Sequence, residues 1–451
     1  MAAPHERRRR PARRVTDPEG KNEIAATGSL TGRLHLVGWR DPKVVALALV
    51  AMAAGFGQFG ATAALGDVAR GFGRVVPGAS LADQAGLSLS AIGLGLAVIR
   101  LASLGSLPLA GAADRLGRRR VLLSTCALGL ACTAAAALSP GYWWFIAVFA
   151  LGRPFMSASA ALTQVGAAEH TASSDRAKAI ALVAGGYGIG AGLTAVLHGL
   201  AEGTLGFRGI FGLALVPLVL LPLVGRRITE PERFAVAEAE TEHPTPVLGA
   251  VARPFRRRLA VVAALAFAVS VVTGPANSLT FLYAENTLHL PGAATAAMVV
   301  AAGAFGLAGL VVGRWLADHL GRRPTGALAM GALCLFGVVA YSGSRPALFI
   351  GYELGVLAAS TFAPAGGALA NELFPTDVRA SVAGWNVTAG VLGAAAGLVA
   401  FGEIATVAGS YGAAAAIVFL PVLATIALFL LLPETRGREP EDLWTASGRS
   451  E

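Results

Sequence analysis

The sequence predicts an all-α membrane protein whose twelve transmembrane helices form two six-helix repeats. Of its 451 residues, 55% are apolar and only 14% are charged. An average soluble protein carries roughly 25% charged residues, so this chain has too few for a soluble surface. Twelve spans of about 21 residues would use roughly 252 positions, which is close to the apolar share of the chain. No window alternates apolar and polar residues as a strand of a membrane β-barrel does.

Twelve apolar runs are long enough to cross a bilayer. We place these spans at 44–65, 88–111, 121–138, 143–166, 178–200, 207–224, 259–283, 292–315, 325–344, 347–370, 381–402 and 411–432. They form an N-terminal bundle over 44–224 and a C-terminal bundle over 259–432. We expect a basic, disordered cytosolic tail over 1–43, a cytosolic linker over 225–258 and a short cytosolic tail over 433–451.

Lysine and arginine are distributed unevenly between the two sides of the predicted spans. With the N-terminus inside, the inner segments hold 30 of them and the outer loops hold four, Arg70, Arg74, Arg208 and Arg345. Basic loops stay in the cytoplasm, so we expect a multi-pass protein of the plasma membrane with both termini cytoplasmic. The same asymmetry accounts for the net charge of +9 without a nucleic-acid partner. The expected surroundings are the lipid bilayer, and the expected state is a monomer.

Several kinds of chemistry have no signature in this sequence. Cys126, Cys132 and Cys334 all lie inside apolar runs, so neither a disulfide framework nor a cysteine metal site is indicated. The chain has no phosphate-binding loop and no catalytic triad. We therefore expect no enzyme activity, no cofactor and no metal. The basic first segment lacks the apolar stretch that a signal peptide places next to its charges.

Short motifs recur in the two halves of the chain. DRLGRRR begins at Asp114, and DHLGRRP begins at Asp318, 204 positions later. Arg176 and Arg379 follow the fourth and the tenth spans, 203 positions apart. The prolines of ITEPERF and LPETRG, after the sixth and the twelfth spans, are 202 positions apart. Motifs repeated in constant order indicate two parallel six-helix units with a binding site between them, which is a transporter architecture.

The first of these motifs resembles the signature of the major facilitator superfamily, G-x-x-x-D-R-x-G-R-R. It is matched in the first half by Asp114, Arg115, Gly117, Arg118 and Arg119, and in the second half by Asp318, Gly321, Arg322 and Arg323. Ala110 and Arg314 stand where the family has its first glycine. The resemblance covers residues 44–443. It implies the major facilitator fold and transport by alternating access.

The remaining loop motifs are similar to those of the sugar porter branch of that family. The resemblance implies a cytoplasmic gate, in which carboxylates and guanidiniums form bidentate charge-assisted bonds and stabilise the outward-facing state. From the first motif the gate would take Asp114, Arg115, Gly117, Arg118, Asp318, Gly321 and Arg322. From the other motifs it would take Glu169, Arg176, Glu232, Arg233, Glu372, Arg379, Glu434 and Arg436. The alternative is that the arginines of these loops only set the topology.

Polar side chains inside the spans are the candidates for a substrate or coupling site. They are Gln58, Arg100, Arg153, Asn277, Glu353 and Asn386. A charge inside a membrane is costly and is a functional candidate by default. Arg100 and Arg153 fall near the middle of their spans, and Glu353 falls nearer the outer side. The structural alternatives are a bond from an arginine to a carbonyl, a pairing of Glu353 with an arginine, and amides that only join helices.

Two arginines against one carboxylate make the membrane interior positive, which favours an anionic solute. The sequence therefore predicts a secondary active transporter of a small organic solute, and an organic acid in particular, by proton symport with Glu353 as the proton carrier. Two alternatives stay open. A proton-driven exporter of drugs or metabolites would carry a Gly-Pro pair in the fifth span, where this chain has GGYGIGAG. A non-transporting sensor would add a large cytosolic domain.

Some polar and aromatic residues have no assigned role in this scheme. His198 and Glu403 fall at the outer ends of their spans, and we expect both to face water. Asp67 and Glu285 also fall near outer ends. Tyr187 and Trp385 are candidates for aromatic side chains in the cavity.

Overall fold

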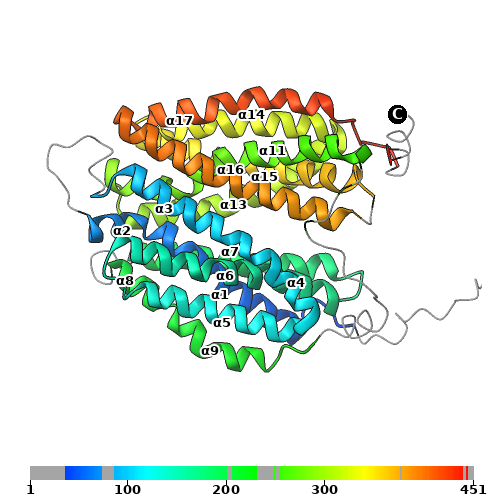
Figure 1. The fold of residues 1–451 in the computed structure, drawn as a ribbon, viewed down its shortest axis with the longest axis horizontal. Helices are drawn as coiled ribbons and strands as arrows, with labels where there is room; N and C mark the ends of the chain where they lie inside the picture. The colour runs from blue at the N-terminus through cyan, green and yellow to red at the C-terminus, as the bar shows by residue number, and fades with distance from the viewer. Residues whose placement is uncertain are drawn as a thin grey trace, which may run out of the picture. The chain divides into compact units, whose positions relative to one another are not determined.

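A computed structural model describes residues 36–73, 86–200, 206–230, 248, 251, 253–375, 378–439 and 443–444. Within these ranges the regular structure is helical, and the one bridge between extended residues joins Val37 to Thr171. Twelve helical segments are long and apolar enough to cross a membrane, and Figure 1 shows the helices running side by side. The prediction of an all-α fold with twelve spans is confirmed.

The first half of the chain provides six of these segments. Its helices are α1 (Pro42–Ala63), α2 (Leu65–Phe72), α3 (Leu89–Ala102), η3 (Ser103–Gly105), α4 (Ser106–Leu116), α5 (Arg118–Ala136), α6 (Tyr142–His170), α7 (Arg176–Leu200), α8 (Gly206–Gly212) and α9 (Leu215–Gly225). The pieces α3, η3 and α4 form the second span, and α8 and α9 form the sixth.

The second half provides the other six segments. Its helices are α11 (Arg253–Ser278), α12 (Thr280–Leu282), η4 (Tyr283–Thr287), α13 (Gly292–His319), α14 (Arg322–Ala340), α15 (Arg345–Glu372), α16 (Arg379–Ala408), α17 (Tyr411–Phe419) and η5 (Leu420–Leu431). The seventh span ends in η4, a single π-helical turn. Such turns are frequent at functional sites.

Each predicted span coincides with one of the membrane-length helices, although several helices are longer than their apolar run. The span placed at 143–166 is part of α6, which continues to His170, and the span placed at 381–402 is part of α16, which continues to Ala408. An apolar run ends at the first polar residues, whereas helical hydrogen bonding continues through the headgroup region. Hydropathy therefore locates the spans well and their ends less well.

The two halves pack their helices in the same pattern. The first span pairs with the fifth in each half, as α1 with α7 and as α11 with α16. The third pairs with the fourth, as α5 with α6 and as α14 with α15. The repeat that the loop motifs indicate is therefore a repeat of helix packing as well.

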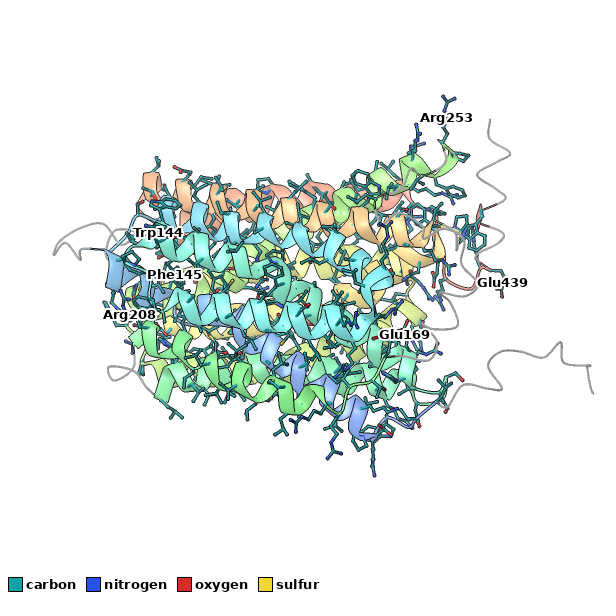
Figure 2. All side chains as sticks on the ribbon, turned by 60° about the horizontal axis from the view of Figure 1, so that its bottom comes forward. Trp144, Phe145, Glu169, Arg208, Arg253 and Glu439 are labelled. Atoms are coloured by element: carbon teal, nitrogen blue, oxygen red, sulfur yellow. The ribbon has the colours of Figure 1, made fainter. Side chains whose placement is uncertain are left out.

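The helices share two ends, which differ in composition. We call the basic end the one that carries the two arginine-rich loops, between α4 and α5 and between α13 and α14, and we call the opposite one the far end. Figure 2 places Glu169 and Glu439 at the basic end, and Phe145 and Arg208 at the far end.

Near the far end the two halves approach each other closely. A Cβ atom on Gly93 of α3 would lie 2.5 Å from the carbonyl oxygen of Leu398 in α16, and one on Gly402 would lie 2.4 Å from the carbonyl oxygen of Leu89. Only glycine permits this backbone contact. The hydroxyl oxygen of Thr406 in α16 also accepts hydrogen bonds from the N–H and hydroxyl of Ser90, each over 3.0 Å.

Candidate functional site

A cavity of about 100 Å³ lies between the two halves. Its polar lining comes from four helices of the first half and one of the second, namely Gln58, Thr62, Arg100, Arg153, Tyr187, Asn277 and Ser278. Four of the six residues that the sequence selects as site candidates are thereby brought together. They meet because polar side chains in a membrane span turn toward the interior of the bundle.

The two arginines of this cavity have few partners among the described residues. Arg153 donates one long bond of 3.5 Å to the carbonyl of Gln58, and its Nε is buried without a hydrogen-bond partner. The charges of Arg100 and Arg153 repel each other. Among the described residues, no Asp or Glu lines this cavity. A ligand that brings negative charge would satisfy both guanidiniums at once.

Gln58 is held in place by the backbone beside Arg153. Its side-chain amide donates to the carbonyl of Met156 over 3.1 Å, and its own carbonyl accepts the bond from Arg153. These two bonds tie α1 to α6 directly beside the cavity. Gln58 therefore positions Arg153, in addition to lining the cavity itself.

A second cavity, of about 270 Å³, adjoins the first within the second half. Asn277 lines both cavities, and most of the second lining is apolar, including Leu333, Tyr352 and Val356. The pair of cavities suits a solute with an anionic group at one end and an apolar body at the other, because each part would meet its own kind of surface.

The other two candidates lie elsewhere. Asn386 lines a third cavity, of about 210 Å³, among apolar residues of the second half such as Leu265 and Phe429. Glu353 lines none of these cavities, and both of its carboxylate oxygens are buried without a hydrogen-bond partner among the described residues. The alternative that pairs Glu353 with Arg100 or Arg153 is therefore not found. Trp385, a candidate cavity aromatic, lines none of them either.

At the basic end, the first half builds a charged cluster around Arg118. The Arg118 guanidinium bonds to Glu169 and lies 3.0 Å from an oxygen of Asp114. Gly117 has a φ of 93°, which only glycine adopts at low cost. The turn at Gly117 points the first N–H groups of α5 at the Glu230 carboxylate, which accepts from Arg118 and from Arg119. The cluster thus joins α4, α5, α6 and the segment after α9.

The second half builds the same cluster around Arg322. This guanidinium lies 3.2 Å from Glu372 and 3.4 Å from Asp318. Gly321 has a φ of 111°, and the Glu434 carboxylate accepts the first N–H groups of α14, from Arg322 over 2.8 Å and from Arg323 over 3.0 Å. A negative charge at a helix N-terminus also interacts favourably with the helix dipole.

Glu434 is a strong acceptor in this cluster. Burial alone would raise the pKa of its carboxyl, but the backbone N–H groups that donate to it hold that pKa below the ordinary value. The donors are Arg322, Arg323, Arg436 and Thr435. Glu434 therefore remains ionised in mildly acidic solution.

The residue of the first half that corresponds to Glu434 is Glu230. An alignment of ITEPERF with LPETRG on their prolines does not show this correspondence, because Glu230 precedes its proline whereas Glu434 follows its own. The separation of Glu230 and Glu434 is 204 positions, the same as that of Asp114 and Asp318. That constant offset is the sequence signal that identifies Glu230. Glu232 and Arg233, which the sequence suggests for the gate, lie outside the described residues.

The remaining gate candidates make contacts within their own half. None of the contacts found between described residues joins them to the other half. Arg379 donates to the carbonyl of Phe374 over 3.1 Å, and the backbone N–H of Arg436 donates to Glu434. Arg115 is exposed, and the Nε of Arg176 is buried without a hydrogen-bond partner. The hydrogen bonds and ion pairs found between described residues at the basic end each join parts of one half. In this conformation, they brace each bundle separately.

At the far end, two expectations fail. His198 is buried, with 4% of its side chain exposed, and it bonds to Glu285, so it does not face water. Glu285 is buried as well, so Glu353 is not the only embedded carboxylate. Glu403, by contrast, is exposed as expected. No pattern in the sequence indicates a contact between His198 and Glu285, because the two residues lie in different halves.

A sequence profile of the Major Facilitator Superfamily matches residues 45–342 and 307–447. The chain belongs to this superfamily. A gallate transporter of Pseudomonas putida is 27% identical over 72% of this chain and 79% of its own length. A "Probable 4-methylmuconolactone transporter" of Cupriavidus pinatubonensis is 27% identical over 63% of this chain and 67% of its own.

Solved structures of the superfamily share the fold. The inward-open xylose transporter XylE of E. coli has a TM-score of 0.67 at 17% identity, over 89% of this chain and 98% of XylE. The nucleoside transporter NupG has a TM-score of 0.69 at 13% identity, over 86% of this chain and 98% of NupG. With its membership of the superfamily, the chain is a multi-pass membrane transporter and not an enzyme.

Proposed function

We propose that this transporter imports an organic acid across the plasma membrane together with protons, by alternating access. The observation that carries the proposal is the cavity between the halves, where Arg100 and Arg153 meet with no Asp or Glu among the described lining residues. A carboxylate that binds there makes charge-assisted bonds to two guanidiniums, and such bonds contribute about 1.5–3 kcal/mol each. A neutral sugar would leave both charges unpaired.

The neighbouring cavity supports a solute with an apolar or aromatic body. Its wall combines aliphatic side chains with Tyr352, and Asn277 stands at the boundary with the arginine cavity. Gallate carries a carboxylate on an aromatic ring, and the gallate transporter of Pseudomonas putida is a relative of this chain. An aromatic or ring-containing acid is the solute class that fits both surfaces.

The orientation follows from the basic loops. We place the basic end, both termini and the linker over 225–258 in the cytoplasm, because arginine-rich loops are retained there. The contacts that join the halves then lie toward the outer side of the membrane, where Gly93 meets Leu398 and Ser90 meets Thr406. This conformation is accordingly closed toward the outside. The transporter works as a monomer with one bundle over 44–224 and another over 259–432.

Glu353 is a proton carrier in this proposal. An ionised carboxylate without a partner is costly in a protein interior, and both oxygens of Glu353 are buried without a hydrogen-bond partner among the described residues. A proton on Glu353 removes that cost. Proton binding and release at this position would couple the conformational cycle to the proton gradient.

Thermal-shift measurements on purified protein in detergent test the solute class. Gallate, xylose, an amino acid and a lipophilic cation are compared at about pH 5.5 and about pH 7.5, because a ligand that binds only the folded state raises the melting temperature. We expect stabilisation by gallate alone, and its loss in Arg153→Gln. The matched control is Arg314→Gln, which removes an exposed arginine at the basic end. Stabilisation by xylose or the cation in place of gallate would refute the proposal.

A further inference from the structure

A cluster of polar side chains joins the two halves at the far end, apart from the arginine cavity. His198 of α7 lies between two carboxylates. Its Nδ1 is 3.5 Å from an oxygen of Asp67 in α2, and its Nε2 is 3.2 Å from an oxygen of Glu285 in η4. Asp67 belongs to the same half as His198, whereas Glu285 belongs to the other half. The imidazole is therefore a bridge between the halves.

This arrangement suits a protonated imidazole. Both ring nitrogens can donate only when the ring carries its second proton. A neutral ring that donates to Glu285 through Nε2 would turn the lone pair of Nδ1 toward the Asp67 carboxylate, and the two would repel. With the proton, each nitrogen faces an acceptor, and the ring pairs with both carboxylates.

Arg70 is a further charged side chain in the cluster, and it affects the balance of positive and negative charge. Arg70 of α2 lies 2.6 Å from an oxygen of Asp67 and 4.0 Å from one of Glu285, and it donates to Asn286. Among the described residues of the cluster, two positive charges therefore face two negative charges when His198 is protonated. Without that proton, these same residues keep one net negative charge in a largely buried place, which is costly.

The elements packed around the ring add no further charge among the described residues. Thr295 of α13 donates to Glu285 over 3.1 Å. Arg208, the one charged residue of α8, donates instead to the carbonyls of Ala137 and Ser139. Helix α12 has no charged side chain. Gly66 lets α2 close on the cluster, since a Cβ atom there would lie 2.9 Å from the Glu285 carboxylate.

We propose that His198 is a proton-binding site whose occupancy controls closure of the far end. When the halves separate there, His198 keeps Asp67 but loses Glu285, so the closed state binds the proton more tightly than the open state. By linkage, lowering the pH favours closure and raising it favours opening. The role of this site in the transport cycle rests on the proposed function. In that cycle, an acidic outer solution drives the carrier toward its inward-facing state after it has bound solute from outside.

The test is a distance measurement across the far end of the full chain, without any solute. Spin labels are attached at Leu138→Cys and Val407→Cys, exposed positions beyond α5 in the first half and near the end of α16 in the second. The three native cysteines are replaced by alanine, and the protein is placed in lipid nanodiscs. One linked proton changes the ratio of open to closed molecules by up to about tenfold per pH unit. The fraction of molecules with the long distance between labels, which is the open state, should therefore rise from about pH 5.5 to about pH 8.

Three variants decide the cause of that change. We expect His198→Gln and Glu285→Gln each to weaken the dependence of the distance on pH, with only the part that Glu353 contributes left, while a single symmetric elution peak verifies that they fold. His319→Gln, at an exposed histidine of the basic end, should leave it unchanged. A wild type whose distances do not respond to pH, or a His198→Gln variant that responds as the wild type does, would overturn the inference. Because no solute is present, failure here is separate from failure of the organic-acid proposal.

Discussion

The basic end and the far end use the same kinds of side chain for different tasks. At the basic end, Arg118 and Arg322 are each surrounded by an Asp, a Glu from a neighbouring helix and a second Glu that accepts backbone N–H groups. Each of these clusters lies within one half. At the far end, Arg70 and His198 reach across to Glu285.

The contacts that must break during transport are the ones between the halves. A contact within one half moves with its bundle, so it can persist through the whole cycle. A contact between halves must break whenever that end opens. The duplicated clusters are therefore expected to set the stability of each bundle, and the single far-end cluster is expected to set the balance between conformations.

The largest effect is expected from a wedge between the halves. In Gly93→Val the new Cβ would lie 2.5 Å from the Leu398 carbonyl oxygen, so the far end cannot close without displacing α3 from α16. Overpacking costs about 1–3 kcal/mol, which lowers the closed population about 5- to 150-fold. Transport by proteoliposomes should fall accordingly. The matched variant is Gly111→Val in α4, where a Cβ atom would meet nothing within 4 Å; equal losses in both would contradict this account.

An effect on the stability of the bundles and not on their conformation, equal in the two halves, is expected from the repeated arginines. Arg118→Gln and Arg322→Gln each leave carboxylates of one bundle without their partner, at a cost of about 1–3 kcal/mol. The melting temperature should fall by similar amounts in the two variants. The distance across the far end should keep its dependence on pH, because neither cluster joins the halves. A change in that dependence would mean that the basic end also controls the conformation.

The Glu434 carboxyl is expected to make a contribution to stability that depends on pH. Its pKa is lower in the folded protein than in the unfolded chain, so the contribution is complete above the unfolded value and is lost as the pH falls through the folded one. The Glu434→Gln variant should melt at a lower temperature than the wild type near pH 7. The gap between the two should narrow as the pH is lowered toward about 4, and a gap that widens instead would contradict the assignment.

The smallest effect is expected at the ion pair of Asp175 and Lys178 near the start of α7. The two side chains are 3.1 Å apart, but the lysine is 60% exposed. Ion pairs three or four positions apart on a helix contribute about 0.2–0.5 kcal/mol. Asp175→Asn should therefore change neither the melting temperature nor the transport rate measurably. A clear loss of transport would show that this loop does more than the structure indicates.

The twelve spans and their repeat were predictable because each leaves a local signal in the sequence. Hydropathy located the spans, and the DRLGRRR and DHLGRRP motifs located the repeat. Polar residues in spans point inward, so Gln58, Arg100, Arg153 and Asn277 could be selected before their shared cavity was known. Asn386 is also a polar residue inside a span, but it lines a different cavity. The sequence position of a polar residue shows its depth in the membrane and not which residues surround it.

The far-end cluster could not be predicted, because it depends on how the halves dock. The positions 204 residues after Asp67 and His198 are Val271 and Gly402, so no repeat marks either residue. The contact of His198 with Glu285 joins residues far apart in the chain, from elements with no common pattern. Glu230, by contrast, had a usable signal in its constant offset from Glu434.

Uptake of labelled gallate by proteoliposomes is the decisive experiment for an organic-acid carrier. The vesicles are made with an acidic outer solution and a neutral lumen, and then with the gradient collapsed by an ionophore. We predict that gallate accumulates only with the gradient and that Arg153→Gln abolishes the accumulation, while Arg314→Gln leaves it intact. Accumulation that survives in Arg153→Gln, or uptake of xylose in place of gallate, would contradict an organic-acid carrier built around the two arginines.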